Sequence, residues 1–277
     1  MKIYFGDNQF LGVNHSQGLG SHYLDRYRDP QSIANTLKDA WEAGIRDFSF
    51  TVTPKTIQAI NLIIEDCPFN LHPSIPYAHA VNDLISEKGL LGAIKDKVSK
   101  AGLFSTITSV FPAMLGNYIP VIGSLIRAEL SGLPMSRVQS VGLLNVATDF
   151  LIGINRFDIL RQFDLAVQKI GIKTVFYTMN LDRLAKGISK EGCKGCSIVF
   201  NLNQSGFRMN PSKKKVFESI KKYDHFEMVA MSLFSGSHKG DLQKFLESCP
   251  EIDGVLFGSS NKNNIINSVE LFSDAQR

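Results

Sequence analysis

The sequence predicts an α/β fold, a (β/α)8 TIM barrel in which eight parallel strands alternate with helices. Short apolar segments rich in β-branched and aromatic residues alternate with helical patterns along the whole chain. The length of 277 residues suits one large barrel better than two small domains. No repeat, low-complexity tract or linker interrupts the alternation. We therefore expect a single barrel domain over residues 1–277.

The first predicted strand covers residues 3–5, and its continuation to residue 13 is left open. The remaining apolar segments lie at regular intervals, each followed by a helical pattern, which favours a closed barrel over an open sheet. They are residues 47–51, 71–75, 141–146, 174–177, 197–201, 226–231 and 254–257. Three helix starts are predicted where a capping side chain precedes a proline, at Asp29–Pro30, Thr53–Pro54 and Asn210–Pro211.

The interval between the third and fourth strands is about twice as long as its neighbours, which predicts a helical insertion at about residues 82–138. Its centre, residues 103–126, carries no charged residue, but prolines and glycines interrupt it too often for a membrane span. We interpret this segment as a buried helical lid or a homodimer contact. Peripheral membrane contact and an apolar substrate pocket remain the alternatives.

Charge and cysteine content narrow the classes of partner and compartment. The chain has 30 basic and 26 acidic residues, and their only cluster, residues 213–215, is interpreted as a solvated helix face, so no nucleic-acid partner is expected. Four cysteines are too few for a disulfide framework, and no signal-peptide pattern is recognised, so we expect a cytoplasmic protein. Cys193 and Cys196 lack a second ligand pair and are interpreted as part of a turn.

In a barrel of this kind, side chains that follow the strands converge on one mouth. Asp7, Asn8, Asn14 and His15 follow the first strand, where a carboxylate can tune an imidazole for proton transfer while the amides hold a substrate oxygen. The alternative is that these residues only form a turn. Tyr77 and His79 follow the third strand and suit acid–base work on a carbonyl. The predicted catalytic residues are therefore Asp7, His15, Tyr77 and His79.

Other polar residues follow the later strands and are predicted to bind the substrate. Arg208 can grip a carboxylate or phosphate, with a solvated loop charge as the alternative. The amides after the sixth strand are interpreted as a hydrogen-bonding wall. The substrate-binding set is Asn8, Asn14, Asn145, Asp149, Asn180, Asn201, Asn203 and Arg208.

The eighth strand is followed by Gly258, Ser259 and Ser260, directly before a predicted helix. The glycine would let an anion approach the backbone, while the serine hydroxyls and the helix N-terminus would bind it. The alternative is that one of the serines caps the helix. We expect a phosphate-binding edge at this end of the barrel.

The segments 229–236 (VAMSLFSG) and 252–264 (IDGVLFGSSNKNN) resemble the last two strands of aldo/keto reductases, over about the last fifty residues. The resemblance implies an NADP or NAD cofactor, with Tyr177 or Asn180 near the nicotinamide. The Asp, Tyr, Lys and His of that family are not in register here. Residues 6–15 also resemble a group of microbial barrel proteins without an assigned activity. The residues that would line the cofactor are Ser232, Leu233, Ser235, Gly236, Gly258, Ser259, Ser260, Lys262 and Asn264.

These observations favour an enzyme of aldo/keto-reductase-like architecture that acts on a small carbonyl or phosphorylated compound, as an NAD(P)-dependent oxidoreductase. The alternatives are a cofactor-free phosphosugar isomerase or lyase and a non-catalytic ligand-binding barrel. No lysine follows a strand, which disfavours a Schiff-base aldolase. Asp7, His15 and His79 lie on different strands without local ligand spacing, so no metal is expected.

Overall fold

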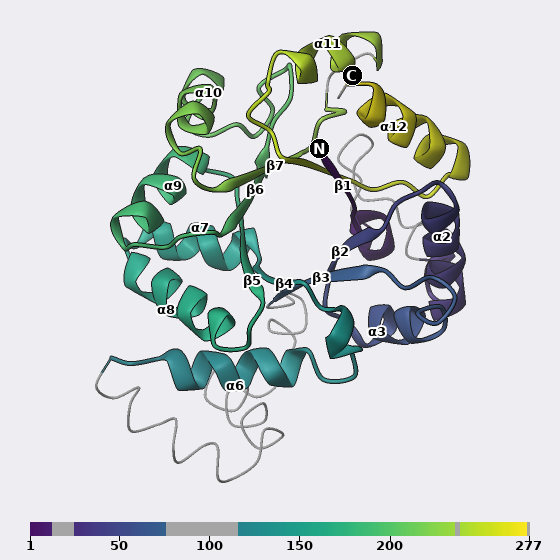
Figure 1. Ribbon diagram of the computed structural model, residues 1–277, viewed down its shortest axis with the longest axis horizontal. Helices are drawn as coiled ribbons and strands as arrows, with labels where there is room; N and C mark the ends of the chain where they lie inside the picture. The colour runs from purple at the N-terminus through teal and green to yellow at the C-terminus, as the bar shows by residue number, and fades with distance from the viewer. Residues whose placement is uncertain (13–24, 76–115, 236–238, 276–277) are drawn as a thin grey trace.

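The computed structural model describes residues 1–12, 25–75, 116–235 and 239–275. Eight strands pair in parallel in sequence order, and β1 pairs with both β2 and β8, so the sheet closes into a barrel (Figure 1). The predicted (β/α)8 class is confirmed. The strands are β1 Lys2–Phe5, β2 Asp47–Thr51, β3 Asn70–Ile75, β4 Ser140–Leu143, β5 Lys173–Thr178, β6 Ser197–Asn201, β7 Glu227–Met231 and β8 Gly254–Phe257.

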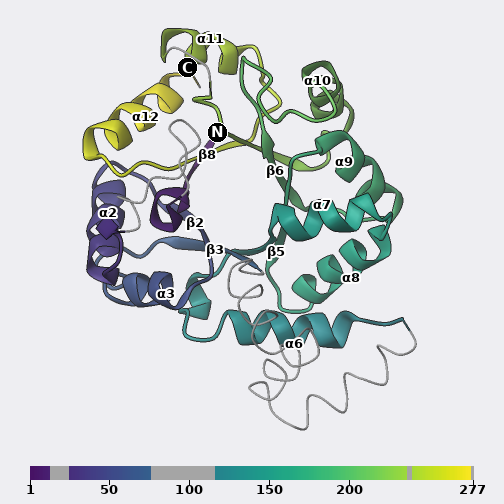
Figure 2. The same cartoon turned by 180° about the vertical axis from the view of Figure 1, so that it is seen from behind.

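The helices form a ring around the barrel, as Figure 1 and the reverse view in Figure 2 show. Two short 3-10 helices, η1 Asn8–Leu11 and η2 Met135–Arg137, lie in connections. The α-helices are α2 Pro30–Glu42, α3 Pro54–Asn61, α6 Ile119–Glu129, α7 Asn145–Gly153, α8 Phe157–Gln168, α9 Leu181–Lys190, α10 Lys213–Lys222, α11 Lys239–Glu247 and α12 Lys262–Asp274.

Side chains that point outward from the sheet are large and apolar, whereas many that point inward are polar. Phe48 and Phe50 are buried between sheet and helices, with stacked rings whose centroids are 4.8 Å apart. Because side chains alternate along a strand, Ser49 between them faces the barrel interior, where it meets Tyr177. The main core therefore lies between sheet and helices, and the interior of the barrel is free to hold polar groups.

Two of the three predicted helix starts are confirmed. Asp29 caps α2 by accepting a hydrogen bond from the backbone N–H of Gln31, and Thr53 caps α3 in the same way. The start at Asn210–Pro211 is wrong, because α10 begins at Lys213 and the Ser212 hydroxyl accepts from the backbone N–H of Lys215. A side-chain cap therefore decided this helix start in place of the proline. The basic cluster 213–215 lies on the exposed face of α10, as interpreted.

Two strands are shorter than the sequence suggested. β1 ends at Phe5, and its open continuation does not occur over residues 8–11, which form η1 and end at Gly12 with a φ of 71°. The fourth strand ends at Leu143 because α7 begins at Asn145, and the Thr148 hydroxyl donates to the Leu143 carbonyl. Both shortened strands bring helical turns close to the mouth of the barrel.

Most of the predicted insertion lies outside the described residues, which include only its residues 116–138. Within it, α6 packs against α8 and buries Ile126, so residues 119–126 belong to a regular helix of the ring. In the part of the chain that the structure describes, no helix is long and apolar enough to cross a membrane. Dimer or membrane contact through residues 103–126 stays a prediction.

Candidate functional site

A cavity of about 540 Å³ opens at the carboxyl ends of the strands. Its volume is in the range of small-molecule sites, and its position is the usual one for active sites in this fold. The structure brings many of the predicted residues together on its walls. They are Asp7, Asn8, Asn145, Tyr177, Asn201, Arg208, Ser232, Leu233, Ser235, Gly258, Ser259, Ser260 and Asn264.

Three other predicted residues hold loops together and do not line this cavity. The Asp149 carboxylate accepts hydrogen bonds from the Thr178 hydroxyl at 2.6 Å and the Met179 N–H at 3.0 Å. Asn180 caps α9. The Asn203 side chain accepts from the Phe207 N–H at 2.7 Å and donates to the carbonyl of the same residue. Their amide and carboxylate groups are engaged with the backbone that follows β5 and β6.

Lys262 also lies away from the cavity lining. Its ammonium contacts Asp39 at 3.1 Å and Glu42 at 2.5 Å on α2. The remaining predicted residues, Asn14, His15, Tyr77, His79 and Gly236, lie outside the described residues, so their roles stay predictions. The same holds for the metal set, of which Asp7 alone is described.

Asp7 is the buried carboxyl group of the mouth. It follows β1, is only 7% exposed, and its Oδ2 accepts a hydrogen bond from the backbone N–H of Thr51 at 2.6 Å. Burial raises the pKa of Asp7 to about 6, and the hydrogen bonds that favour the carboxylate only partly oppose this shift. A carboxyl group with a pKa near 6 can both release and accept a proton close to neutral pH.

Gly258 lies on the cavity wall and also makes room for a neighbouring side chain, while its predicted contact with an anion stays a prediction. A Cβ at this position would lie 2.3 Å from Gln9 Oε1, so the absence of a side chain lets Gln9 pack against the end of β8. Gln9 Nε2 donates to the Gly6 carbonyl at 2.8 Å, which fixes the amide. The sequence-based interpretation missed Gln9, because its partner Gly258 lies at the other end of the chain and only the fold brings the two together.

The edge of the mouth at β8 lies at the start of α12. Asn261, and neither of the two serines, caps α12 by accepting from the Asn264 N–H at 3.1 Å. Ser259 and Ser260 lie at the cavity wall beside the positive end of the helix dipole, and the Ser259 hydroxyl accepts a hydrogen bond from the Asn261 N–H at 3.2 Å. Arg26, which the sequence did not single out, donates to the Ser260 carbonyl at 2.8 Å and adds a nearby cation.

Arg208 supplies a second cation, on the wall formed by the loop after β6. Its backbone φ is 54°, and its guanidinium lies 5.0 Å from the centre of the Phe207 ring. Asn201 holds this loop by donating to the Arg208 carbonyl, and Asn201 accepts from the Ser232 hydroxyl at 2.7 Å. Asn201 therefore ties the loops after β6 and β7 together at the mouth.

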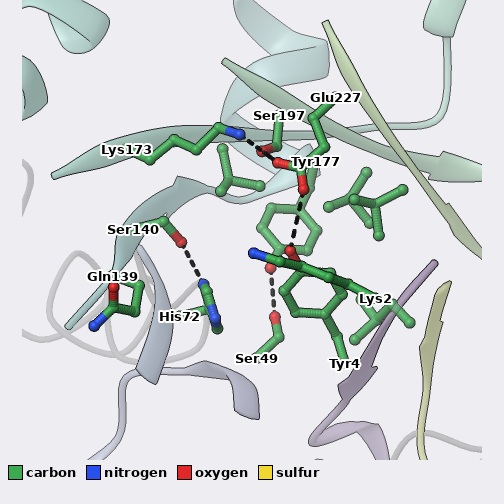
Figure 3. A pocket seen from close by; sticks show the side chains of 14 residues that line it. Lys2, Tyr4, Ser49, His72, Gln139, Ser140, Lys173, Tyr177, Ser197 and Glu227 are labelled. Carbon is green, nitrogen blue, oxygen red and sulfur yellow. Dashed lines mark hydrogen bonds and ion pairs between the residues drawn. The ribbon is translucent and has the colours of Figure 1, made fainter. Parts of the chain in front are cut away.

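Tyr177 and Ser49 form the floor of the cavity. Their hydroxyl oxygens are 2.5 Å apart, and burial raises the pKa of Tyr177 to about 12, so the phenol keeps its proton at neutral pH. Tyr177, Ser49 and Leu256 also line a second, smaller cavity on the other side of this floor (Figure 3).

No known family and no curated protein matches the sequence. Two solved structures from Pseudomonas aeruginosa, provisionally described as aldo-keto reductases, are 11% and 10% identical and have TM-scores of 0.58 and 0.57. Each alignment covers 99% of this chain and 90% of the other. An archaeal fructose 1,6-bisphosphate aldolase is 11% identical with a TM-score of 0.47, over 99% of this chain and 92% of its own. At this identity the chain shares the barrel fold with the two Pseudomonas structures.

The raised pKa of Asp7 predicts a pH-dependent stability that Asp7→Asn removes. Between about pH 4 and pH 6 the unfolded chain loses this proton before the folded chain does, so the free energy of unfolding falls as the pH rises. The free energy of unfolding falls by roughly 3 kcal/mol in total, and this fall is complete above pH 6. In urea unfolding at pH 7.5, Asp7→Asn should be more stable than the wild type, and the difference should disappear near pH 4. Exposed Asp66→Asn is the control; equal pH profiles for wild type and Asp7→Asn would refute the prediction.

Proposed function

We propose that this chain is an enzyme that acts on a small carbonyl or phosphorylated compound in the mouth cavity, with Asp7 as its acid–base residue. The observation that carries the proposal is the buried Asp7 carboxyl, with its pKa near 6, on a cavity that also has Ser259, Ser260 and Arg208 on its walls. Structural networks also perturb pKa values, but Asp7 lies at the strand ends where barrel enzymes place their chemistry.

The anionic group of the substrate would bind at the edge formed by Ser259, Ser260 and the N-terminus of α12, with Arg208 on the neighbouring wall. This leaves the rest of a small compound facing Asp7 and the Tyr177–Ser49 floor. The carboxylate of Asp7 would take a proton from the carbon next to the carbonyl and return it after rearrangement. The N–H of Thr51 holds the carboxylate in place during both steps. This sequence of steps describes a cofactor-free isomerase or lyase.

A nicotinamide-dependent oxidoreductase is the second candidate, because the walls after β7 and β8 are lined with small polar residues. Ser232, Ser235, Ser259 and Ser260 leave room for a dinucleotide backbone, and the N-terminus of α12 suits its phosphates. NAD or NADP, when bound, would supply or accept a hydride. No lysine or histidine lines this cavity among the described residues, so Asp7 would have to serve as the proton donor.

An anion at the mouth should stabilise the folded chain. Inorganic phosphate at tens of millimolar is expected to raise the melting temperature above that in sodium chloride of equal ionic strength, since a ligand that binds only the folded state stabilises it. Arg208→Gln should lose at least about half of this increase. Lys262→Gln removes the same charge from a residue outside the cavity and should keep the increase. Equal responses of the two variants would exclude anion binding by Arg208.

Proton abstraction can be detected before the natural substrate is known. In D₂O, dihydroxyacetone phosphate should exchange its carbon-bound hydrogens next to the carbonyl for deuterium faster with the wild-type chain than without protein. The exchange is followed by ¹H NMR. Asp7→Asn should slow this exchange by about 10²-fold to 10⁴-fold because the amide cannot accept the proton. Binding of phosphate without any exchange over the wild-type background would instead favour a non-catalytic ligand-binding barrel.

The oxidoreductase candidate makes a separate prediction about cofactor binding. Titration with NADPH or NADH should raise the melting temperature by more than inorganic phosphate does and should change the intrinsic fluorescence. A Ser260→Glu change places a negative charge at the edge formed by Ser259, Ser260 and the N-terminus of α12. It should weaken the binding of either cofactor about tenfold. If neither cofactor at millimolar concentration shifts the melting temperature, the candidate is rejected.

A further inference from the structure

The amino ends of the strands surround a second cavity, of about 170 Å³, inside the barrel (Figure 3). The floor formed by Tyr177, Ser49 and Leu256 separates it from the mouth cavity. Its walls also include Lys2 and Gln139, both of which are exposed, so the cavity opens at the face of the barrel opposite the mouth. Interiors of such barrels are commonly filled with packed side chains, and this one leaves room for a small ligand.

Strands β2, β3 and β4 carry an aspartate, a histidine and a serine in hydrogen-bonded series, and the histidine and the serine line this cavity. His72 Nε2 lies 2.8 Å from Asp47 Oδ1, and His72 Nδ1 lies 2.8 Å from Ser140 Oγ. The second of these bonds is drawn in Figure 3. A nucleophile bonded to a base that a third group orients is the arrangement of nucleophilic catalysis.

The proton positions follow from the state of Asp47. Burial alone would raise the pKa of this carboxyl, but the hydrogen bond and the charge interaction with His72 outweigh burial and hold it below its ordinary value. Asp47 is therefore ionised and can only accept, so His72 Nε2 carries the ring proton. Nδ1 is then free to accept the hydrogen of the Ser140 hydroxyl. In this tautomer, Nδ1 is the ring atom placed to act as a general base toward Ser140.

The fold holds these three side chains rigidly. They project inward from adjacent paired strands, with Asp47 opposite Asn70 and Ser49 opposite His72 in the β2–β3 register. The Tyr4 ring packs edge-on against the His72 ring, with centroids 5.0 Å apart, which fixes the plane of the imidazole. Sites built on strands keep their geometry better than sites on loops.

The remaining walls suit a short acyl group. Val175, Val199, Val229 and Leu256 provide an apolar side to the cavity. Lys173 and Ser197 are both bonded to Glu227, and the Lys2 ammonium is a further cation of the rim, whose charge also acts on Glu227 and Asp47. In Figure 3 the Lys2 side chain extends across the cavity towards His72 and Tyr177. A cation in this position can stabilise the negative oxygen that forms when a carbonyl is attacked.

We propose that Ser140, His72 and Asp47 form a second catalytic centre, which hydrolyses small esters of short-chain carboxylic acids. Ser140 Oγ attacks the carbonyl carbon while its proton moves to His72 Nδ1, and the bond to the alcohol oxygen breaks as His72 returns that proton to the alcohol. Water then attacks the acyl-serine and loses a proton to His72 Nδ1, and the bond between the acyl carbon and Ser140 Oγ breaks as His72 returns that proton to Oγ, which releases the acid. The net reaction converts ester and water to acid and alcohol. This centre is independent of the mouth cavity and of Asp7.

The test is acylation of the intact chain by p-nitrophenyl acetate, with acid quenching and peptide mapping by mass spectrometry. The acetyl group is expected on Ser140, together with a burst of nitrophenolate. Asp47→Asn, which favours the wrong histidine tautomer, should slow acylation by at least about 10²-fold, and Ser140→Ala should abolish it. Ser197→Ala is the matched control, because this buried serine faces the same cavity but donates to Glu227. It should acylate like the wild type.

Circular dichroism reports whether each variant is folded. If a variant does not fold, mapping of the acetylated residue in the wild-type chain still tests the proposal. Acetyl groups only on lysines or the amino terminus would overturn it. So would nitrophenolate release by folded Ser140→Ala at the wild-type rate. Acetylation of Ser232 or Ser259 in place of Ser140 would place the reactivity in the mouth cavity and likewise overturn the second centre.

Discussion

The pairing of β1 with β8 is the constraint on which the rest of the structure depends. It closes the barrel and sets Phe5 opposite Phe257, so the residues that follow both strands must share one edge. Asp7, Gln9 and Gly258 are neighbours for this reason, although about 250 residues separate them. The missing side chain at Gly258 and the fixed amide of Gln9 are consequences of this closure, because the two chain segments approach too closely for a Cβ.

The alternation of side chains along each strand gives the barrel two different environments, an apolar layer outside the sheet and a more polar interior. Outward residues such as Phe48 and Phe176 fill the layer beneath the helices, while the inward residues are small or polar. An interior of this kind stabilises the fold less than a packed apolar interior, because polar groups lose hydration and must find partners. Tyr177 and Ser49 satisfy each other, and Asp7 finds the Thr51 N–H. The polar groups that result are available for chemistry at both ends of the barrel.

The two cavities differ in what surrounds them. The mouth is built from loops and helix ends, and its walls include Arg208 and the residues before the N-terminus of α12. The smaller cavity is built from strand residues, among them Lys173, which is paired with Glu227, and His72, which is hydrogen-bonded to Asp47. The Tyr177–Ser49 floor lies between them, and Tyr177, Ser49 and Leu256 line both cavities.

The sequence by itself determined the barrel, the position of its strands within a few residues and the polar character of the mouth, because alternation and capping are local properties. It did not reveal Gln9 or Arg26, nor that Asp149 and Asn203 serve the backbone, because such roles depend on partners that only folding brings near. His72 gave no local signal either, since its partners Asp47 and Ser140 lie on neighbouring strands. Tertiary structure decided these contacts because barrel closure and strand register set the distances between residues remote in the chain.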